Sequence, residues 1–495
     1  MPTPVLKLKD SHAYKGCVLT YGHFSTIHPG HIRYLRHARG LGEKLVVALI
    51  GDAGEIDYPF SQEERSEALS MLGIADAVLL LETDELNEVL TELKPSLLVL
   101  GNEYKENTKI QICLKIQREQ GRGVQFHAGE IHYATADLLT GSERDISQQR
   151  HHLFKTACKR QNIRKKDLIK SIDEWQKCNL IVIGDTIVDQ YAACEAIGMS
   201  AEAPVVVVRE LEHKNFIGGA AVVAAHISAL GAHCDLISVV GADDTAELVK
   251  QELIDKGIGD GITTDPARPT TFKKRYLVEN QKLFRVSRLE EQNLNAEVEE
   301  QLIGRLKKLA PKSDGIVVSD FVYGVITPRI LKVIQKLARE HDLKLFGDLQ
   351  CSSQIGSITQ FKNFSLLCPN EREARLALQD KDSGLEQLSQ RLLHITGSER
   401  LIMKLGAEGF IAYDRKANGD VRSQAFPALS VNPLDVAGAG DSLLALVATC
   451  LATGQAMMPS AALACCMASI AVETMGNTPI SSETLRASLE EVLDQ

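Results

Sequence analysis

The run Asp435-Val-Ala-Gly-Ala-Gly-Asp441 stands immediately before an apolar stretch of helical length, LLALVATCLA. The small residues Gly438, Ala439 and Gly440 let the backbone surround an anion, and their amides at a helix start would point to it. Asp441 follows directly, so its carboxylate can accept a proton from a hydroxyl that attacks the bound group. The pattern predicts phosphoryl transfer to an alcohol.

A second pattern combines histidines and glycines in Thr20-Tyr-Gly-His-Phe-Ser-Thr-Ile-His-Pro-Gly-His31. His28 and His31 are three residues apart and project to one side of a starting helix, and Gly22 lets the backbone approach a ligand. Two imidazoles beside the amides of a helix N-terminus predict a phosphate site. The alternatives are a polar helix cap and a zinc site that adds His23, for which no fourth ligand is near.

Apolar runs of strand length alternate with polar segments of helix length around both patterns. The first series predicts strands at 18–21, 45–50, 77–81 and 97–100, and the second at 180–183, 235–239, 315–319, 344–346, 365–367 and 401–404. Such alternation is typical of parallel sheets covered by helices on both faces. The predicted fold class is therefore α/β, with two doubly wound domains.

The predicted domain boundaries follow the same alternation. We expect a small domain at residues 1–140 and a larger one at residues 178–495. Residues 141–177 are basic and partly helical, and we expect a linker whose charges are solvated. A basic face for an anionic partner is the alternative for this segment.

The composition of the chain argues against several classes of protein. The chain has 495 residues, a net charge of −10, 44% apolar and 24% charged residues, which are ordinary globular values and do not favour a nucleic-acid partner. The cysteines show no CxxC pair and no zinc-finger spacing, and no apolar run is long enough for a membrane span. We expect a reduced, cytoplasmic protein with no membrane partner, and Cys351, which has no partner cysteine nearby, as an incidental thiol.

The N-terminal pattern resembles the cytidylyltransferase-like nucleotidyltransferases over about residues 16–140. The resemblance rests on His28-Pro-Gly-His31, Asp52 and Gln62-Glu-Glu-Arg65. It implies that His28 and His31 stabilise a transferring phosphate, that Arg65 holds phosphate oxygens, and that Thr135 covers the triphosphate of CTP or ATP. The chain departs from the family where Ser25 replaces the aspartate of G-x-F-D and where the loop GDAGEIDYPF contains no cation.

The C-terminal pattern resembles the ribokinase/PfkB family of carbohydrate kinases over about residues 178–490. Besides the run that ends in Asp441, four segments in family order carry the resemblance: Gly184-Asp-Thr-Ile-Val-Asp189, Gly218-Gly219, Asn370-Glu-Arg-Glu373 and Lys404-Leu-Gly-Ala-Glu-Gly409. The resemblance implies a ribokinase-like fold with a small β lid and a kinase that uses ATP and Mg²⁺. No GxxxxGK[ST] string of a P-loop kinase occurs.

The same resemblance assigns roles to residues of these segments. Asp441 would be the base, with Gly438, Ala439 and Gly440 as the anion hole. The acceptor sugar would be bound by Asp185, Asp189, Gly218 and Gly219. The nucleotide would lie against Lys404, Gly406 and Gly409, and Asn370 and Glu373 would organise Mg²⁺ indirectly. Each of these short segments has a purely structural alternative, such as a turn or a helix start.

Within this family, SAEAPVVVVRE and VSDFVYGVI resemble the heptose-phosphate kinase branch, which is known fused to an HxGH nucleotidyltransferase for ADP-heptose synthesis. The domain order of this chain is the reverse. Val222 and Tyr323 stand where that branch has an asparagine and a lysine, and the sequence after Asp348 lacks the lysine of its D-P-K. These losses favour a less phosphorylated or differently shaped sugar.

The sequence therefore predicts a bifunctional enzyme that phosphorylates a sugar or sugar phosphate with ATP and then transfers a nucleotidyl group from an NTP to a sugar phosphate. The product would be a nucleotide-activated, heptose-like sugar for a surface glycan. One alternative is a sugar kinase whose N-terminal domain only binds nucleotide and regulates, and another is a non-catalytic nucleotide-sensing scaffold. Residues 205–208 resemble a lid strand through which the family's kinases dimerise, so a homodimer is expected.

Overall fold

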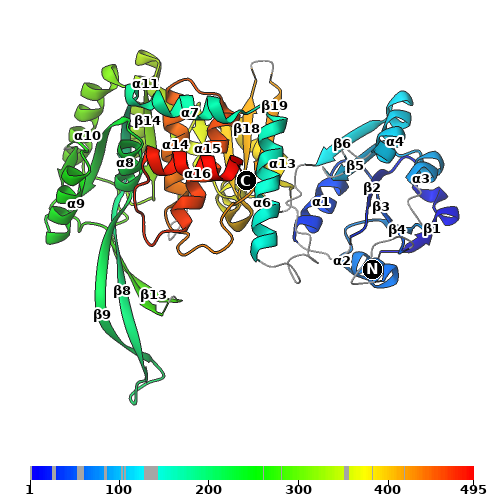
Figure 1. The fold of residues 1–495 in the computed structure, drawn as a ribbon, viewed down its shortest axis with the longest axis horizontal. Helices are drawn as coiled ribbons and strands as arrows, with labels where there is room; N and C mark the ends of the chain where they lie inside the picture. Colours follow the sequence, from blue (N-terminus) through cyan, green and yellow to red (C-terminus); the bar gives the residue numbers. More distant parts are fainter. Residues whose placement is uncertain are drawn as a thin grey trace. The chain divides into compact units, whose positions relative to one another are not determined.

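The computed structural model describes residues 3–24, 29–52, 61–82, 86–101, 104, 108–127, 143–259, 261–279, 281–350, 356–381, 383–416 and 419–494. The chain divides into two compact units. One comprises Met1–Ile146 and Gln379–Arg391, and the other comprises Ser147–Leu378 and Leu392–Gln495. Each unit is built on its own sheet (Figure 1), and the predicted α/β class with two doubly wound parts is confirmed.

Six parallel strands form the sheet of the N-terminal unit, in the order β1-β4-β3-β2-β5-β6. The strands are β1 (Val5–Lys7), β2 (Val18–Gly22), β3 (Leu45–Leu49), β4 (Ala77–Leu80), β5 (Leu97–Gly101) and β6 (Gly123–His127), and the helices are α1 (Pro29–Arg39), α2 (Gln62–Leu72), α3 (Leu86–Leu93) and α4 (Thr108–Glu119). The strand order reverses direction between β2 and β5, and ligands of open α/β sheets bind at the carboxyl ends of the strands at such a point. Gly22 ends β2 at this position.

The second unit contains a nine-stranded sheet in the order β11-β10-β7-β14-β15-β16-β17-β18-β19. Its strands are β7 (Asn179–Gly184), β10 (His233–Val240), β11 (Ile262–Thr264), β14 (Gly315–Asp320), β15 (Lys344–Leu349), β16 (Leu366–Leu367), β17 (Arg400–Lys404), β18 (Phe410–Arg415) and β19 (Val421–Phe426). The strands from β11 to β17 pair in parallel, and β18 and β19 are antiparallel. The strands β11, β18 and β19 were not predicted from the sequence.

Helices cover both faces of this sheet. From residue 143 onward they are α6 (Glu143–Arg160), α7 (Lys165–Asp173), α8 (Ala220–Ala229), α9 (Asp244–Asp255), α10 (Ala296–Leu309), α11 (Pro328–His341), α12 (Glu371–Leu378), α13 (Leu385–Thr396), α14 (Ala439–Ala452), α15 (Met457–Val472) and α16 (Ser482–Asp494). Val317 of β14 belongs to the core cluster with α8 and α14. Its neighbours Ile316 and Val318 point to the other face and are equally buried, as expected for a doubly covered strand.

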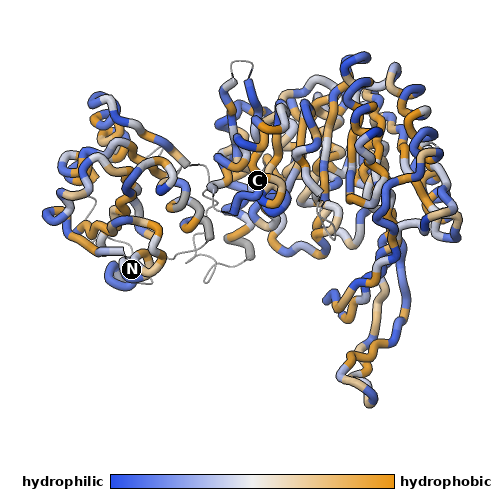
Figure 2. Tube along the Cα trace, turned by 180° about the vertical axis from the view of Figure 1, so that it is seen from behind, coloured by the Kyte–Doolittle hydropathy of each residue, from blue (hydrophilic) through white to orange (hydrophobic). Residues whose placement is uncertain are grey.

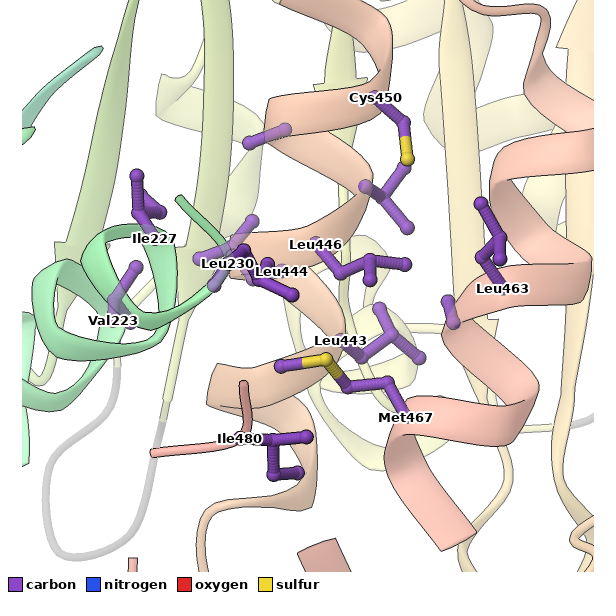
Figure 3. Close-up of a cluster of buried hydrophobic side chains, with 14 of the residues drawn as sticks. Val223, Ile227, Leu230, Leu443, Leu444, Leu446, Cys450, Leu463, Met467 and Ile480 are labelled. Carbon is purple, nitrogen blue, oxygen red and sulfur yellow. The ribbon is translucent and has the colours of Figure 1, made fainter. Parts of the chain in front are cut away.

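Helix α14 is fixed in this core by apolar contacts along its whole length. Leu443, Leu444 and Leu446 are buried and lie between Ile227 of α8 and Leu463 of α15 (Figure 3). Each fully buried leucine contributes about 1.5–3 kcal/mol relative to an exposed one. The packing therefore holds the helix firmly and leaves its N-terminal turn in a defined place.

A four-stranded lid of order β13-β12-β8-β9 extends from the nine-stranded sheet (Figures 1 and 2). Its strands are β8 (Thr186–Met199), β9 (Val206–Gly219), β12 (Phe272–Val278) and β13 (Gln281–Arg288). The outer parts of these strands expose apolar side chains, among them Ile197, Met199, Val206, Leu211 and Phe284. The predicted small β lid is confirmed.

Of the predicted linker at 141–177, the described residues 143–177 are largely helical, as predicted, but they do not form a solvated connector. Phe154 of α6 and Trp175, which follows α7, are 0% exposed and belong to the main core of the second unit. Arg150 of α6 donates a hydrogen bond to the carbonyl of Ser430 in the loop before α14. The basic residues that suggested a linker lie on the outer side of helices whose apolar side is buried, a pattern that charge counting alone does not detect.

Two further observations concern the described residues. None of their helices is both long and apolar enough to cross a bilayer. Their cysteines are all free thiols, most of them buried.

Because α6 is part of the core, Phe154→Ala should destabilise the second unit by about 3–5 kcal/mol. Chemical unfolding followed by fluorescence measures this directly, since Trp175 is the single tryptophan of the chain and lies in the same cluster. The control Lys166→Ala, at an exposed position of α7, should change the free energy of unfolding by less than about 0.5 kcal/mol. Equal effects of the two substitutions would show that α6 is not part of the folded core.

Candidate active sites

Charged residues gather at the carboxyl ends of four strands in the nine-stranded sheet. Asp185 follows β7, Asp320 ends β14, Asp348 lies next to the end of β15, and Lys404 ends β17. These strands are parallel members of one sheet, so the side chains lie along one edge. This edge is where open α/β sheets bind ligands.

The first turn of α14 lies at the same edge. A β-carbon at Gly440 would be 3.3 Å from Nζ of Lys404 and 3.9 Å from Oδ2 of Asp348. Gly438 is the N-cap residue, has a φ of +85°, and no side chain caps the helix. The first amides of a helix have no acceptor inside it, so Gly438, Ala439 and Gly440 present N–H groups that favour an anion.

Asp441 lies in that first turn and is 4% exposed. Its Oδ1 accepts a hydrogen bond of 2.9 Å from Nε2 of Gln350. Burial and the negative charge of Asp348 raise the pKa of Asp441 to about 7, and Lys404 and the Gln350 hydrogen bond act in the opposite direction. A carboxyl group that titrates near neutrality can accept a proton and release it again.

The predicted acceptor residues lie together at the base of the lid. The Asp185 carboxylate accepts backbone hydrogen bonds from Phe321 at 2.8 Å and from Tyr323 and Val325 at 3.3 Å, so it also shapes the loop after β14. Asp189 forms an ion pair with Arg275 of β12.

The diglycine is explained by close packing against the same two residues, Asp189 and Asp185. A β-carbon at Gly218 would lie 2.6 Å from Oδ2 of Asp189, and one at Gly219 would lie 2.1 Å from the carbonyl oxygen of Asp185. Gly219 also has a φ of +63°. Larger residues at either position would displace the strand that carries Asp189.

The segment around Asn370 forms a helix start. Asn370 N–H donates to Glu373 at 2.8 Å, and Glu373 N–H donates to Oδ1 of Asn370 at 2.8 Å. This reciprocal pair caps α12, which is the structural alternative that the sequence left open. Glu373 is nevertheless buried close enough to Lys404 to raise the pKa of that ammonium.

The turn after β17 depends on its glycines. Gly406 and Gly409 have φ values of +65° and +93°, and a β-carbon at Gly409 would lie 2.1 Å from the carbonyl oxygen of Phe426. The two glycines therefore set the path of the hairpin from β17 to β18. Nucleotide contact by Gly406 and Gly409 stays a prediction.

In the N-terminal unit the predicted residues are placed only in part. His31 lies in the first turn of α1, and its ring centroid is 5.3 Å from that of Phe24. Gly22 ends β2, where a β-carbon would be 3.3 Å from the Phe24 ring. His28 and Thr135 lie outside the described residues, and so does Cys351 of the second unit.

Arg65 is 2% exposed, and its guanidinium is turned toward the protein. It donates to the carbonyl oxygens of Ile50 and His23 and to the Asp52 carboxylate. These bonds tie together the segments that follow β2 and β3. A contact of Arg65 with nucleotide phosphate stays a prediction.

The profile of the family described as "pfkB family carbohydrate kinase" matches residues 177–485. The chain belongs to this carbohydrate kinase family. A second profile, described as "Cytidylyltransferase-like", matches residues 19–127. The predicted order, a cytidylyltransferase-like domain followed by a carbohydrate kinase domain, is thereby confirmed.

Relatives with curated names match nearly two thirds of the chain. "Bifunctional protein HldE" of Geobacter metallireducens is 32% identical over 308 residues, which are 61% of this chain and 61% of the relative. The protein of the same name from Campylobacter jejuni subsp. doylei is 29% identical over 315 residues, 63% of this chain and 65% of the relative. The matched region thus spans less than two thirds of these relatives.

Solved structures show the fold. Phosphofructokinase-2 from Escherichia coli matches 64% of this chain and 99% of its own, with a TM-score of 0.54 and 16% identity. Arabidopsis thaliana ribokinase matches 63% of this chain and 99% of its own, with a TM-score of 0.50 and 18% identity. The predicted ribokinase-like fold of the kinase domain is confirmed.

Sequence reasoning missed a cluster that joins the kinase lid to the α14 loop. Asp435 is 2% exposed, and its carboxylate accepts from the Tyr191 hydroxyl at 2.6 Å and from Nζ of Lys282 at 2.7 Å. The backbone amides of Ala437 and Gly476 donate to the same carboxylate. Asp435 opens the glycine-rich run, so its place in the sequence was a signal, but its partners on β8 and β13 are distant in sequence.

Two cations of β12 that the sequence did not assign lie near the predicted acceptor residues. Tyr323 stands where the heptose-phosphate kinase branch has a lysine, but Nζ of Lys273 lies 5.0 Å from the centroid of its ring. Lys273 is buried on β12, two residues before Arg275. Val222 is fully buried in α8, and the kind of sugar that the kinase accepts stays a prediction.

Gly438→Ala should disrupt the kinase site because a β-carbon there would lie 1.3 Å from Oδ1 of Asn477. We expect ATP affinity to fall at least about tenfold, since displacement of a binding group by about 1 Å has effects of this size. Gly454, at the other end of α14, has a matching φ of +86° and no atom within 4 Å of a β-carbon. Gly454→Ala should therefore lower stability by about 1–2 kcal/mol and leave ATP affinity unchanged.

Calorimetric titration with ATP and thermal unfolding measure these effects. Adding Asn477→Ala to the Gly438→Ala variant removes the obstructing amide and should recover part of the affinity. Identical behaviour of the two alanine variants would show that the approach of Asn477 is unimportant.

Proposed function

We propose that the chain is a bifunctional enzyme of activated-sugar synthesis. The kinase domain at 178–495 would transfer the γ-phosphoryl group of ATP to a hydroxyl of a sugar or sugar phosphate. The domain at 1–140 would transfer a nucleotidyl group from CTP or ATP to a sugar phosphate and release pyrophosphate. The proposed kinase function is supported above all by Asp441. The pKa of this carboxyl group is raised to about 7, and it lies in the first turn of α14, which no side chain caps.

In the kinase step, the acceptor hydroxyl loses its proton to Asp441 while its oxygen attacks the γ-phosphorus, and the bond to the bridging oxygen of ADP breaks. The amides of Gly438, Ala439 and Gly440 face the charge that develops on the transferring group. Asp189 and the backbone at Gly218 and Gly219 would orient the sugar at the base of the lid.

Mg²⁺ bound with ATP would neutralise charge on the phosphate oxygens. Asn370 and Glu373 bond to each other at the start of α12, which suits the indirect, water-mediated role that the resemblance implies. The Asp348 Oδ1 atom is buried and makes no hydrogen bond to the described residues, so it is a further oxygen that fits a hard cation. Asp348 would thus supply an oxygen to the ion at the edge of the sheet, and Asn370 and Glu373 would act on it through water molecules.

The sugar is proposed to be heptose-like, because several segments resemble the heptose-phosphate kinase branch and the relatives with the name "Bifunctional protein HldE" match the kinase region. Lys273 and Arg275 supply cations on the acceptor side, which supports an acceptor that carries a phosphate group. The nucleotide-linked product would serve a surface glycan.

A second function for the N-terminal domain is nucleotide binding without transfer, as a regulatory module. The inward orientation of Arg65 favours it, because this guanidinium is bonded to His23, Ile50 and Asp52. Ser25 and the cation-free loop after β3 point in the same direction. The full enzyme would keep its kinase activity in either case.

We further propose a homodimer and a cytoplasmic location. The dimer is supported by the exposed apolar residues of the lid strands β8, β9 and β13 and by the dimerisation of related kinases through such a lid. The location is supported by the buried free thiols of the described residues, which suit a reducing compartment.

Kinase activity should depend on the ionisation of Asp441. The base must be deprotonated, and its pKa is raised to about 7. We therefore expect kcat/KM to be about a tenth of its maximum at pH 6, half-maximal near pH 7 and level above about pH 8. The acceptor is first found by screening sugars and sugar phosphates with ATP and detecting products by mass spectrometry. Gln350→Leu, which removes a hydrogen bond to the carboxylate, should shift this midpoint upward.

Asp441→Asn should lower kcat about 10²- to 10⁴-fold and abolish the pH dependence. Unchanged ATP turnover in this variant would contradict the kinase assignment and support a nucleotide-sensing scaffold. Circular dichroism and thermal unfolding verify that the variant is folded.

The two activities should be separable in the full-length chain. His31→Ala should lower NTP-dependent pyrophosphate release about 10²- to 10³-fold and leave the kinase unchanged, whereas Asp441→Asn should do the reverse. His37→Gln, on the same helix α1, is the matched control and should keep both activities. No pyrophosphate release by the wild type with any sugar phosphate and NTP would establish the regulatory alternative.

A further inference from the structure

Lys404 places a buried ammonium group at the first turn of α14. Its Nζ forms an ion pair of 2.6 Å with Oδ2 of Asp348, and the side chains of the two residues are 16% and 1% exposed. The same Nζ would be 3.3 Å from a β-carbon at Gly440. The absence of a side chain at Gly440 therefore provides the room that this ammonium occupies.

This position is electrostatically unfavourable for a cation without a partner anion. A helix N-terminus carries a partial positive charge, and burial disfavours the charged ammonium. The Asp348 carboxylate, 2.6 Å from Nζ, supplies the negative charge that offsets these effects. A buried ion pair is seldom a net source of stability compared with apolar residues, which leaves its presence here to be explained by function.

An anion at the N-terminus of α14 would balance the positive charge that gathers there. Amide groups at 438–440 and the Lys404 ammonium converge on one region, and Asp441 lies beside it with its own carboxylate influenced by both Asp348 and Lys404. Asp348 holds the ammonium through only one of its two oxygens, since Oδ1 makes no hydrogen bond to the described residues. An ammonium has three N–H donors, and Asp348 Oδ2 accepts from one of them, so the others can donate to a second anion.

We propose that Lys404 is a catalytic residue of the proposed kinase, which binds the γ-phosphoryl group during its transfer, and that Asp348 is the positioning residue that holds it there. The inference rests on the proposed kinase function and deepens it. The ammonium stays bound to the oxygens of the phosphoryl group while the new oxygen–phosphorus bond forms and the bond to the bridging oxygen of ADP breaks. Lys404 keeps its proton throughout, and the proton of the acceptor hydroxyl goes to Asp441.

The test is the affinity difference between a triphosphate and a diphosphate, which requires no knowledge of the sugar. Calorimetric titration of the full chain with adenosine 5′-(β,γ-imido)triphosphate and with ADP, both with Mg²⁺, measures it. Lys404→Met should weaken the triphosphate analogue about 10- to 100-fold, as expected for the loss of a charged hydrogen bond, and ADP less than about threefold. Binding at the N-terminal unit is common to all variants and does not affect the comparison.

Three further variants make the result specific. Lys344→Met is the matched control. Lys344 is a partly buried lysine that begins β15 at the opposite edge of the sheet and donates to the carbonyl of Leu451. The Lys344→Met variant should keep the wild-type preference for the triphosphate. Lys404→Arg retains the charge and should restore part of the preference. The double variant Lys404→Met with Asp348→Asn leaves no unpaired buried carboxylate, and it should fold and show the same loss as Lys404→Met.

The outcomes separate the two proposals. A wild type that binds neither nucleotide at the kinase domain would overturn the kinase function, and this inference with it. A wild type that prefers the triphosphate, together with a Lys404→Met variant that keeps this preference or weakens both nucleotides equally, would overturn only the role of Lys404. Asp348→Asn alone should reduce the preference partly, and an unchanged preference would remove Asp348 from the mechanism.

Discussion

The candidate kinase site depends on one group of donors, the backbone amides in the first turn of α14, which bond to no acceptor among the described residues. The helix cannot supply acceptors for them, and Gly438 offers no side chain that could cap them. Leu443, Leu444 and Leu446 fix the rest of the helix in the core (Figure 3), so the turn cannot move away from the edge of the sheet. The apolar packing of the helix therefore holds these amides in place, where an anion can accept their hydrogen bonds.

Three charged side chains lie close to one another around this turn. Asp348 and Asp441 place two carboxylates near Lys404, and burial of all three makes each charge sensitive to the others. Charges in a buried environment interact more strongly than in water. The titration of Asp441 near neutrality therefore results from the same packing that holds α14.

Much of the fold was predictable because buried parallel strands and glycine-rich helix starts leave local signals in the sequence. The strand ends that carry Asp185, Asp320 and Lys404 could be found from apolar runs and the residues that follow them. Lys273 could not be assigned to the acceptor side, because its role depends on the pairing of β12 with β8, which is far away in the sequence. The count of charged residues also predicted a linker at α6, although one face of this helix is buried in the core and only the other face is basic.

The N-terminal site could be predicted only to the level of its strand–turn–helix pattern. Gly22 and His31 lie where that pattern places them, at the end of β2 and the start of α1. The orientation of Arg65 depends on carbonyl groups of two separate loops, and no periodicity or motif contains that information. Side-chain direction at buried cations is decided by the nearest acceptors rather than by local sequence.

The Asp435 carboxylate joins two lid strands to the loop that precedes α14, through Tyr191, Lys282 and the amides of Ala437 and Gly476. Residues on β8 and β13 are therefore linked through one carboxylate to the loop before α14. A displacement of either lid strand would act on this loop as well, because the same acid holds both.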